Sequence, residues 1–309
     1  MKVLVTGGSG FIGSHVVDKL RDKGVITFIY DLPAMRRNNH RTDVEFIPGS
    51  ILDLEGLQGA LKGMDAVFHL AAVADVKDVQ ENPVYAEALN VRGTINVLEA
   101  ARLTHVKRVI YGSTTWVYSA AQPETVDEET PLSAPTHFYT ATKLAAEYYC
   151  RSYSHLYGVE STILRYGIPY GPRARDGAVV PIFVNKAFHG QPLTIAGDGS
   201  QFRKFVYVED LAEGNVLALK PIAANKIYNL DGTERVTIKQ IAECVQRLVG
   251  QVPIVTTEAR PGDFSGKEVV SRKAKQELGW EPKVAFEEGV RRYIDWYKQI
   301  GRASCRERV

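Results

Sequence analysis

The chain has 309 residues, of which 45% are hydrophobic and 24% charged, the composition of an ordinary globular protein that is long enough for a main domain and a smaller one. A formal net charge of +2 excludes the basic footprint of a nucleic-acid-binding protein, and no apolar run approaches the roughly 20 residues of a membrane span. The three cysteines, Cys150, Cys244 and Cys305, are scattered without metal-ligand spacing, so we expect no metal site and a reducing, cytoplasmic location.

Short β-branched runs alternate with helical patterns along the first half of the chain. The pattern predicts strands at residues 2–6, 26–30, 44–48, 66–70, 108–111 and 161–165, and helices at 11–23, 83–103 and 139–157. Such alternation is typical of a parallel, doubly wound α/β sheet. The sequence thus predicts a sheet domain over residues 1–165, to which a strand near 226–230 returns, and a smaller, partly discontinuous α/β lobe over 166–299. An amphipathic helix is expected at 286–299, followed by a disordered tail at 300–309.

The first predicted strand is followed by a glycine-rich turn, Thr6-Gly7-Gly8-Ser9-Gly10-Phe11-Ile12-Gly13, which opens a helix. Gly7, Gly10 and Gly13 let the backbone turn tightly, approach a pyrophosphate and pack the helix against the strand. The N-terminus of that helix attracts negative charge. The turn therefore predicts a dinucleotide site in a Rossmann-type domain, with a turn that serves packing alone as the alternative.

Asp31, at the end of the second strand, decides which dinucleotide is expected. Its carboxylate is placed to accept hydrogen bonds from the adenosine ribose and would repel a 2′-phosphate. This favours NAD over NADP, although Arg36 and Arg37 nearby weaken the preference.

Further cofactor contacts are expected at the carboxyl ends of the third and fourth strands, because parallel sheets bind ligands at that edge. The residues at these ends are Ser50 and Ile51, near the expected adenine, and the small or apolar residues Leu70, Ala71, Ala72 and Val73. His69 has no histidine or cysteine partner at ligand spacing, which indicates a packed strand residue rather than a metal ligand. Asn90 is expected to link a helix to the sheet through its amide.

Tyr139 and Lys143 lie four residues apart in a predicted helix, so their side chains share one face. A phenol has an ordinary pKa near 10, and an adjacent ammonium together with a bound cationic cofactor would favour the phenolate. Taken alone, the pair also fits the solvated face of a surface helix. Thr114, at the end of the fifth strand, supplies a hydroxyl that faces the same end of the cofactor site.

The glycine turn, Asp31, Thr114 and the Tyr139/Lys143 pair together resemble the extended short-chain dehydrogenase/reductase family, in particular its nucleotide-sugar epimerase and dehydratase branch, from Lys2 to about Lys298. The resemblance implies that Tyr139 is the acid/base, that Lys143 holds the nicotinamide ribose and depresses the pKa of Tyr139, and that Thr114 hydrogen-bonds the reacting sugar oxygen. With the positions above, the expected NAD-binding set is Gly7, Gly10, Phe11, Ile12, Gly13, Asp31, Ser50, Ile51, Leu70, Ala71, Ala72, Val73, Tyr139, Lys143 and Tyr166.

The family also implies a homodimer, formed by the helices that correspond to residues 83–103 and 139–157. Tyr148, Tyr149 and Tyr153 would either add aromatic area to such an interface or fill the core between helix and sheet.

The second half of the chain carries fewer motifs. By resemblance, Arg203 and Arg260 grip the diphosphate of a nucleotide sugar, with Asp263 close to the second arginine, and residues 197–199 form a hairpin turn. Asp210 precedes a helical run and is predicted to be its N-cap.

Three positions depart from the sugar-epimerase pattern. Ile168 and Ala178 stand where an asparagine is common, and Ser50 replaces an aspartate. The first two changes remove hydrogen-bonding groups near the substrate, which leaves the chemistry intact and the particular substrate open.

The residues after Thr114 bear on the reaction. Dehydratases of this branch carry an Asp-Glu pair there, whereas this chain has Thr115 and Trp116, which cannot shuttle a proton as a carboxylate would. We therefore expect 4-epimerisation of an NDP-sugar, with a UDP-hexose favoured and no nucleic acid or membrane as partner. UDP-glucuronate epimerase and NDP-sugar dehydratase are the alternatives within the branch. An NAD(P)-dependent ketone or sugar reductase and a non-catalytic, cofactor-sensing relative are the alternatives outside it.

Overall fold

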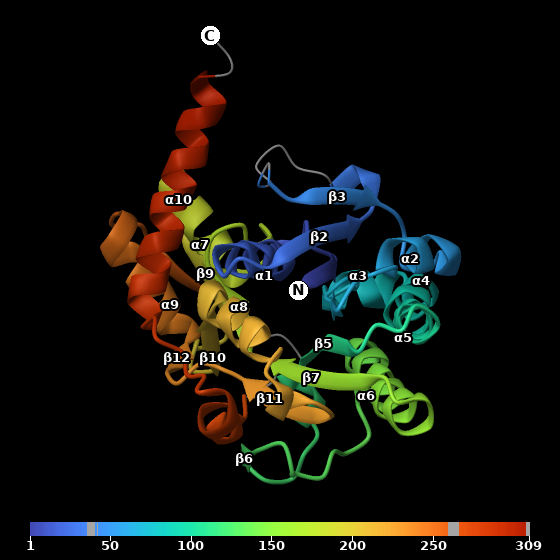
Figure 1. Cartoon of the computed structure of the whole chain (residues 1–309). Coiled ribbons are helices and arrows are strands. Elements are labelled where there is room, and N and C mark those ends of the chain that lie inside the picture. Colours follow the sequence, from blue (N-terminus) through green and yellow to red (C-terminus); the bar gives the residue numbers. More distant parts are fainter. Residues whose placement is uncertain (36–40, 42, 259–265, 307–309) are drawn as a thin grey trace.

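The computed structural model describes residues 1–35, 41, 43–258 and 266–306, and a seven-stranded sheet forms its centre. The strand order is β11-β7-β5-β4-β1-β2-β3, and every neighbouring pair is parallel (Figure 1). The strands are β1 (Lys2–Thr6), β2 (Ile26–Asp31), β3 (Glu45–Pro48), β4 (Ala66–His69), β5 (Arg108–Thr114), β7 (Glu160–Tyr166) and β11 (Lys226–Leu230). The predicted parallel, doubly wound sheet is confirmed, and β11 lies at its edge beside β7.

Helices cover both faces of this sheet. They are α1 (Phe11–Asp22), α2 (Leu54–Leu61), α3 (Val76–Glu81), α4 (Pro83–Glu87), α5 (Gly93–Leu103), α6 (Phe138–Tyr157) and α8 (Val208–Leu217). Successive residues of a strand point to opposite faces. Val3 and Val5 are accordingly buried against α1 and α8, whereas Leu4 is buried against α2, α5 and α6. Because both faces are covered, apolar residues lie on both faces of these strands.

The smaller lobe contains three further sheets with helices packed on them. Its elements are β8 (Ile168–Tyr170), α7 (Val179–Phe188), β9 (Leu193–Ala196), β10 (Phe202–Tyr207), β12 (Arg235–Thr237), α9 (Ile238–Val249), β13 (Ile254–Thr257) and α10 (Phe286–Arg306), and a two-stranded sheet joins β6 (Thr125–Val126) to β14 (Glu268–Val269). Short helical segments lie at Pro33–Met35, Ala88–Arg92, Thr115–Tyr118, Pro221–Ala223 and Ala274–Leu278. The rings of Tyr170, Phe205 and Phe286 meet at centroid distances of 5.0 to 5.9 Å in the core of the lobe.

Several local predictions are wrong. The region 83–103 is not one α-helix, because a π-helical segment, Ala88–Arg92, separates α4 from α5. The turn at 197–199 joins β9 to β10, but β9 pairs with β13 and β10 with β8 and β12, so it is not a hairpin. Asp210 does not cap α8. Its carboxylate Oδ2 instead accepts the main-chain N–H groups of Lys283 and Val284, both at 2.9 Å.

The C-terminal helix is longer than predicted. It runs to Arg306 rather than ending at Gln299. The disorder of residues 300–309 stays a prediction. Alanine and arginine are strong helix formers, and a single interior glycine costs only about 1 kcal/mol, which allows the helix to continue. Residues 307–309 lie outside the described part. Within the described ranges, none of the helices combines the length and the apolar character that a membrane span requires.

Candidate active site

The glycine turn has the shape that a pyrophosphate site requires. Gly7 adopts φ +69°, and its carbonyl accepts the Gly10 N–H at 3.0 Å. A Cβ at Gly13 would lie 2.1 Å from the Gly7 carbonyl oxygen, and one at Gly7 would lie 2.6 Å from the Ala71 nitrogen. Side chains are therefore excluded at both positions, and the backbone itself forms the surface of the turn.

The N-terminus of α1 completes this site. Gly10 is the N-cap and makes no side-chain cap bond, and the first turn of α1 carries no acidic residue. The Ser9 hydroxyl is buried and has no hydrogen-bond partner among the described residues. Open main-chain donors at a helix end and an unpartnered hydroxyl fit the phosphates of a dinucleotide.

Asp31 lies at the end of β2, as predicted, and holds the turn in place. Its Oδ2 accepts the Ser9 N–H at 3.0 Å, and its Oδ1 accepts the Leu32 N–H at 2.9 Å. Each carboxylate oxygen can accept a second hydrogen bond, so the group can also receive ribose hydroxyls. Arg36 and Arg37 lie outside the described residues.

The ends of β3 and β4 border the turn. The Ser50 hydroxyl accepts the Leu52 N–H, and buried Ile51 packs beneath Gly93, where a Cβ would come within 2.5 Å of it. The backbone of Leu70 and Ala71 passes directly over Gly7, which leaves no room for a side chain at Gly7.

Two polar residues near this edge have structural roles, as predicted. The Asn90 amide accepts the Val73 N–H at 2.8 Å and donates to the Val73 carbonyl at 3.0 Å, linking its helix to the end of β4. His69 is fully buried between the hydroxyls of Thr6 and Thr94, at 2.9 and 3.0 Å. Burial lowers the pKa of His69 to about 3, so the ring stays neutral.

Thr114, Tyr139 and Lys143 are brought together at the end of β5. Thr114 is the last residue of that strand, and its side chain is hydrogen-bonded to the Tyr139 hydroxyl. Lys143, one turn further along α6, is buried and donates through Nζ to the Gly112 carbonyl at 2.8 Å. The structure thus places the three predicted catalytic residues in one site.

The pKa of Tyr139 is set mainly by burial. Burial raises it to about 12, and the hydrogen bond with Thr114 and the positive charge of Arg175 only partly oppose that rise. Burial also lowers the pKa of Lys143, to about 8. Burial therefore outweighs the opposing contributions at Tyr139, and the lowering of its pKa by Lys143 together with a bound cationic cofactor stays a prediction.

A buried polar network beneath α6 was missed by the sequence analysis. Glu147, one turn after Lys143, accepts the Ser113 hydroxyl at 2.5 Å and pairs with Arg165 through both carboxylate oxygens, at 3.1 and 2.8 Å. Arg165 also donates to the Tyr118 hydroxyl at 2.7 Å. The position of Glu147 one helical turn from Lys143 was the available signal. The network fixes α6 against β5 and β7, and so fixes the catalytic face.

Tyr166 lies opposite Thr114 on β7. Its hydroxyl donates to Asn215 Oδ1 at 2.5 Å on the α8 side of the sheet. A contact with the cofactor would therefore have to come from its ring or backbone.

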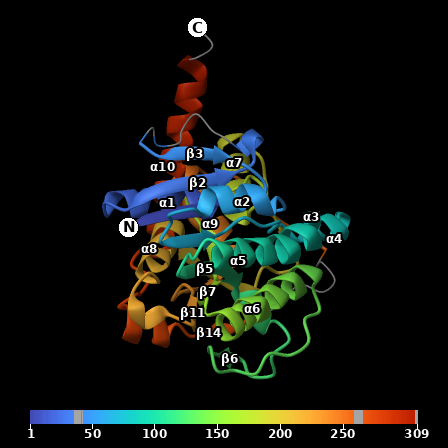
Figure 2. The same cartoon turned by 45° about the vertical axis from the view of Figure 1, so that its right-hand side comes forward.

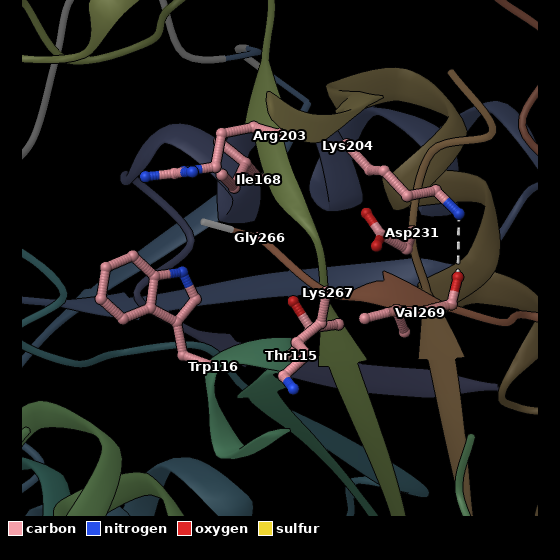
Figure 3. Close-up of a pocket in the computed structure, with 9 residues that line it drawn as sticks. All are labelled: Thr115, Trp116, Ile168, Arg203, Lys204, Asp231, Gly266, Lys267 and Val269. Atoms are coloured by element: carbon pink, nitrogen blue, oxygen red, sulfur yellow. Dashed lines mark hydrogen bonds between the residues drawn. The ribbon is translucent and has the colours of Figure 1, made fainter. Parts of the chain in front are cut away.

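A pocket opens beside Thr115, where the main sheet meets the smaller lobe (Figure 3). Its lining residues are Thr115, Trp116, Ile168, Arg203, Lys204, Asp231, Gly266, Lys267 and Val269. A second pocket, with Val179, Ile182, Phe183 and Ile238 among its walls, shares Arg203 with the first. Arg260 and Asp263, the other two predicted substrate contacts, lie outside the described residues.

A parallel sheet with a glycine turn at its edge and a Thr, Tyr and Lys trio at the end of a neighbouring strand defines a nicotinamide-dependent enzyme of the short-chain dehydrogenase/reductase type. The chain belongs to the NAD dependent epimerase/dehydratase family, whose model matches residues 3–231, so the predicted resemblance is confirmed.

Named relatives match along nearly the whole chain. A putative UDP-glucose 4-epimerase of Methanocaldococcus jannaschii is 34% identical over 307 residues, covering 97% of this chain and 99% of the relative. A UDP-glucuronate 4-epimerase of Thermodesulfobacterium geofontis is 34% identical over 318 residues, covering 96% of each. The solved structure of the UDP-glucose 4-epimerase of Thermus thermophilus in complex with NAD is 36% identical and superposes with a TM-score of 0.88, covering 96% of this chain and 99% of that one.

Proposed function

We propose that the protein is an NAD-dependent 4-epimerase of a UDP-hexose. The observation that carries this proposal is the trio of Thr114, Tyr139 and Lys143 at the end of β5, followed by Thr115 and Trp116 rather than by carboxylates. An elimination of water needs a further acid and base beside the reacting carbons, whereas an epimerisation needs one acid/base and a reversible oxidant.

In this reaction Tyr139 acts as the phenolate to take the proton of the sugar 4-hydroxyl and then as the phenol to return it, while Thr114 orients the oxygen by a hydrogen bond. Lys143, held by the Gly112 carbonyl, is placed to bind the nicotinamide ribose. NAD⁺, which the glycine turn, Asp31 and Lys143 would hold, would supply reversible hydride acceptance at C4, so that a 4-keto sugar free to turn in the pocket could be reduced on either face. Asp31 favours NAD, which argues against an NADPH-dependent reductase.

The two connected pockets suit a nucleotide sugar. The apolar walls provided by Ile182, Phe183 and Ile238 fit a base, and the pocket beside Thr115 fits a sugar. Arg203 lines both, which is where a diphosphate between base and sugar would lie, and a guanidinium suits phosphate oxygens. Residues 1–165 with β11 would then form the NAD-binding domain, and most of 166–299 the substrate lobe.

We also propose a homodimer through residues 83–103, which include α4 and α5, and residues 139–157 of α6. Tyr148 and Tyr149 on α6 are 55% and 37% exposed, and Val84 on α4 is 81% exposed. Tyr153 differs, because its hydroxyl donates to Glu99 Oε2 at 3.2 Å and its ring packs partly into the core. Figure 2 shows α5 and α6 side by side on the outside of the sheet, which leaves this apolar surface available to a second copy. A sedimentation mass of one chain would contradict the dimer.

A cytoplasmic location is part of the proposal. It is supported by Cys150 and Cys244, which are both buried and unpaired, as in a reducing compartment.

The function is tested by incubating the purified protein separately with UDP-glucose, UDP-N-acetylglucosamine, UDP-glucuronate and dTDP-glucose, and separating the products chromatographically. We expect UDP-glucose and UDP-galactose to interconvert without added NAD. Failure to epimerise any of the four substrates, by a preparation whose absorbance shows bound NAD, would contradict the proposal.

A further inference from the structure

A buried carboxyl group in the sugar pocket has no part in the mechanism above. Asp231 follows β11 directly and is only 4% exposed. Leu230 pairs with Tyr166, and Tyr166 pairs with Thr114, so the residues after these three strands lie in a row at one edge of the sheet. Neighbouring strands are about 4.8 Å apart, which places the backbones of Thr115 and Asp231 roughly 10 Å apart, the span of a hexose with its substituents.

The backbone around Asp231 fixes the direction of its side chain. The Gly232 N–H donates to Asp231 Oδ1 at 2.8 Å. Gly167 has no side chain to interfere, since a Cβ there would lie 1.9 Å from the same oxygen. Figure 3 shows the carboxyl group pointing into the pocket, between Ile168 and Val269.

Two lysines that line the pocket are hydrogen-bonded to groups other than this carboxyl group. Lys204 Nζ is bonded to Glu268 Oε1 at 2.6 Å and to the Val269 carbonyl at 2.9 Å. Lys267 Nζ donates to the carbonyls of Ala121 and Pro123, at 2.8 and 3.0 Å. Among the described residues, no ion pair joins Asp231 to a cation. Burial accordingly raises the pKa of Asp231 to about 7, and the more distant charge of Lys204 counters this only in part.

We propose that Asp231 determines the choice of sugar, by accepting a hydrogen bond from a hydroxyl of a neutral hexose and by disfavouring a sugar that carries its own carboxylate. This inference rests on the proposed function and assigns the substrate class of the same site. A buried acceptor gains most from a donor that completes its hydrogen bonds, whereas a second carboxylate in the same pocket is repelled.

The test measures binding rather than turnover. Dissociation constants for UDP-glucose and UDP-glucuronate are determined by calorimetry with the NAD-loaded wild type, Asp231→Asn and a matched control, Asp53→Asn. Asp53 also accepts a glycine N–H, from Gly56 at 3.0 Å, but it caps α2 outside the pocket. We expect the wild type to prefer UDP-glucose, Asp231→Asn to reduce that preference at least tenfold, and Asp53→Asn to leave it unchanged.

An unchanged preference in Asp231→Asn, or an equal change in both variants, would overturn the inference. Asp231→Ser serves as the second variant if Asp231→Asn does not fold, and the same tenfold criterion applies to it. The wild-type product screen separates this outcome from failure of the proposed function: an epimerase whose preference does not depend on Asp231 refutes the inference alone. A wild type that binds neither sugar nucleotide refutes both.

Discussion

The glycine turn at residues 7–13 and the pocket around Asp231 lie at the same edge of the central sheet, but they are built differently. The turn is one continuous segment, shaped by steric limits at Gly7 and Gly13 and by main-chain hydrogen bonds. The pocket takes its side chains from five separate segments, which contribute Thr115 and Trp116, Ile168, Arg203 and Lys204, Asp231, and Gly266, Lys267 and Val269. The cofactor site is therefore fixed by backbone geometry, while substrate choice rests on a few side chains.

If this contrast holds, removal of the acid/base alone should stop the chemistry without loss of NAD. Tyr139→Phe removes the acid/base and is expected to lower kcat by about 10³-fold or more, since general acid/base catalysis contributes roughly 10²–10⁴-fold. Turnover is measured with UDP-glucose, and bound NAD by absorbance after denaturation. Activity within tenfold of the wild type would contradict the role of Tyr139.

In the glycine turn, which forms the cofactor site, the addition of a single methyl group should strongly weaken NAD binding. Gly13→Ala places a Cβ 2.1 Å from the Gly7 carbonyl oxygen, so the turn must move and NAD should bind at least a hundredfold more weakly. Gly59→Ala is the control, because a Cβ there meets nothing within 4 Å, and alanine favours the helix. Equal NAD affinity in the two variants would show that backbone shape does not determine cofactor binding.

In the pocket around Asp231, the charge of a side chain should affect substrate binding more than its shape does. Arg203→Ala removes the guanidinium shared by the two pockets and is expected to raise KM for UDP-glucose about ten- to a hundredfold, because hydrogen bonds to charged groups contribute about 1.5–3 kcal/mol each. Arg247→Ala, which breaks an exposed ion pair with Glu287, is the control. A rise in KM that is the same in both variants would remove Arg203 from the binding site.

The smallest predicted effect concerns pH and stability. The folded-state pKa of Asp231 is raised to about 7 from 3.8, so its neutral form favours folding below pH 4 and this contribution is lost as pH rises through 7. The free energy of unfolding of Asp231→Asn should therefore exceed that of the wild type by about 2 kcal/mol at pH 8, which is less than the full pKa shift implies because the structure relaxes around the charge. Near pH 4 the difference between the two proteins should vanish. Urea titrations at both pH values measure it. A difference that does not change with pH would mean that the carboxyl group is not buried as described.

The elements that the sequence predicted well are those fixed by local patterns. The strands are buried on both faces, and the sequence shows them as β-branched runs. Short segments also contain the glycine turn, Asp31 and the four-residue spacing of Tyr139 and Lys143. The π-helical segment at Ala88–Arg92 and the contacts of Asp210 depend on packing partners far along the chain, and no local pattern contains them.

Within the site, too, local sequence patterns do not contain properties that depend on residues far along the chain. The raised pKa of Tyr139 follows from burial, which spacing cannot supply. Asp231 and Lys204 come from different sheets and line one pocket, which no local pattern shows. The position of Asp231 after a predicted strand of the main sheet was nevertheless a usable signal, because ligands gather at that edge.

Epimerisation at C4 with return of the same hydrogen is the central claim, and an isotope experiment tests it most directly. UDP-glucose deuterated at C4 is incubated with the protein without added NAD, and the UDP-galactose formed is analysed by mass spectrometry. The account predicts that the deuterium is retained at C4 in the product. Loss of the label to solvent or to free cofactor, or the absence of any UDP-galactose, would contradict it.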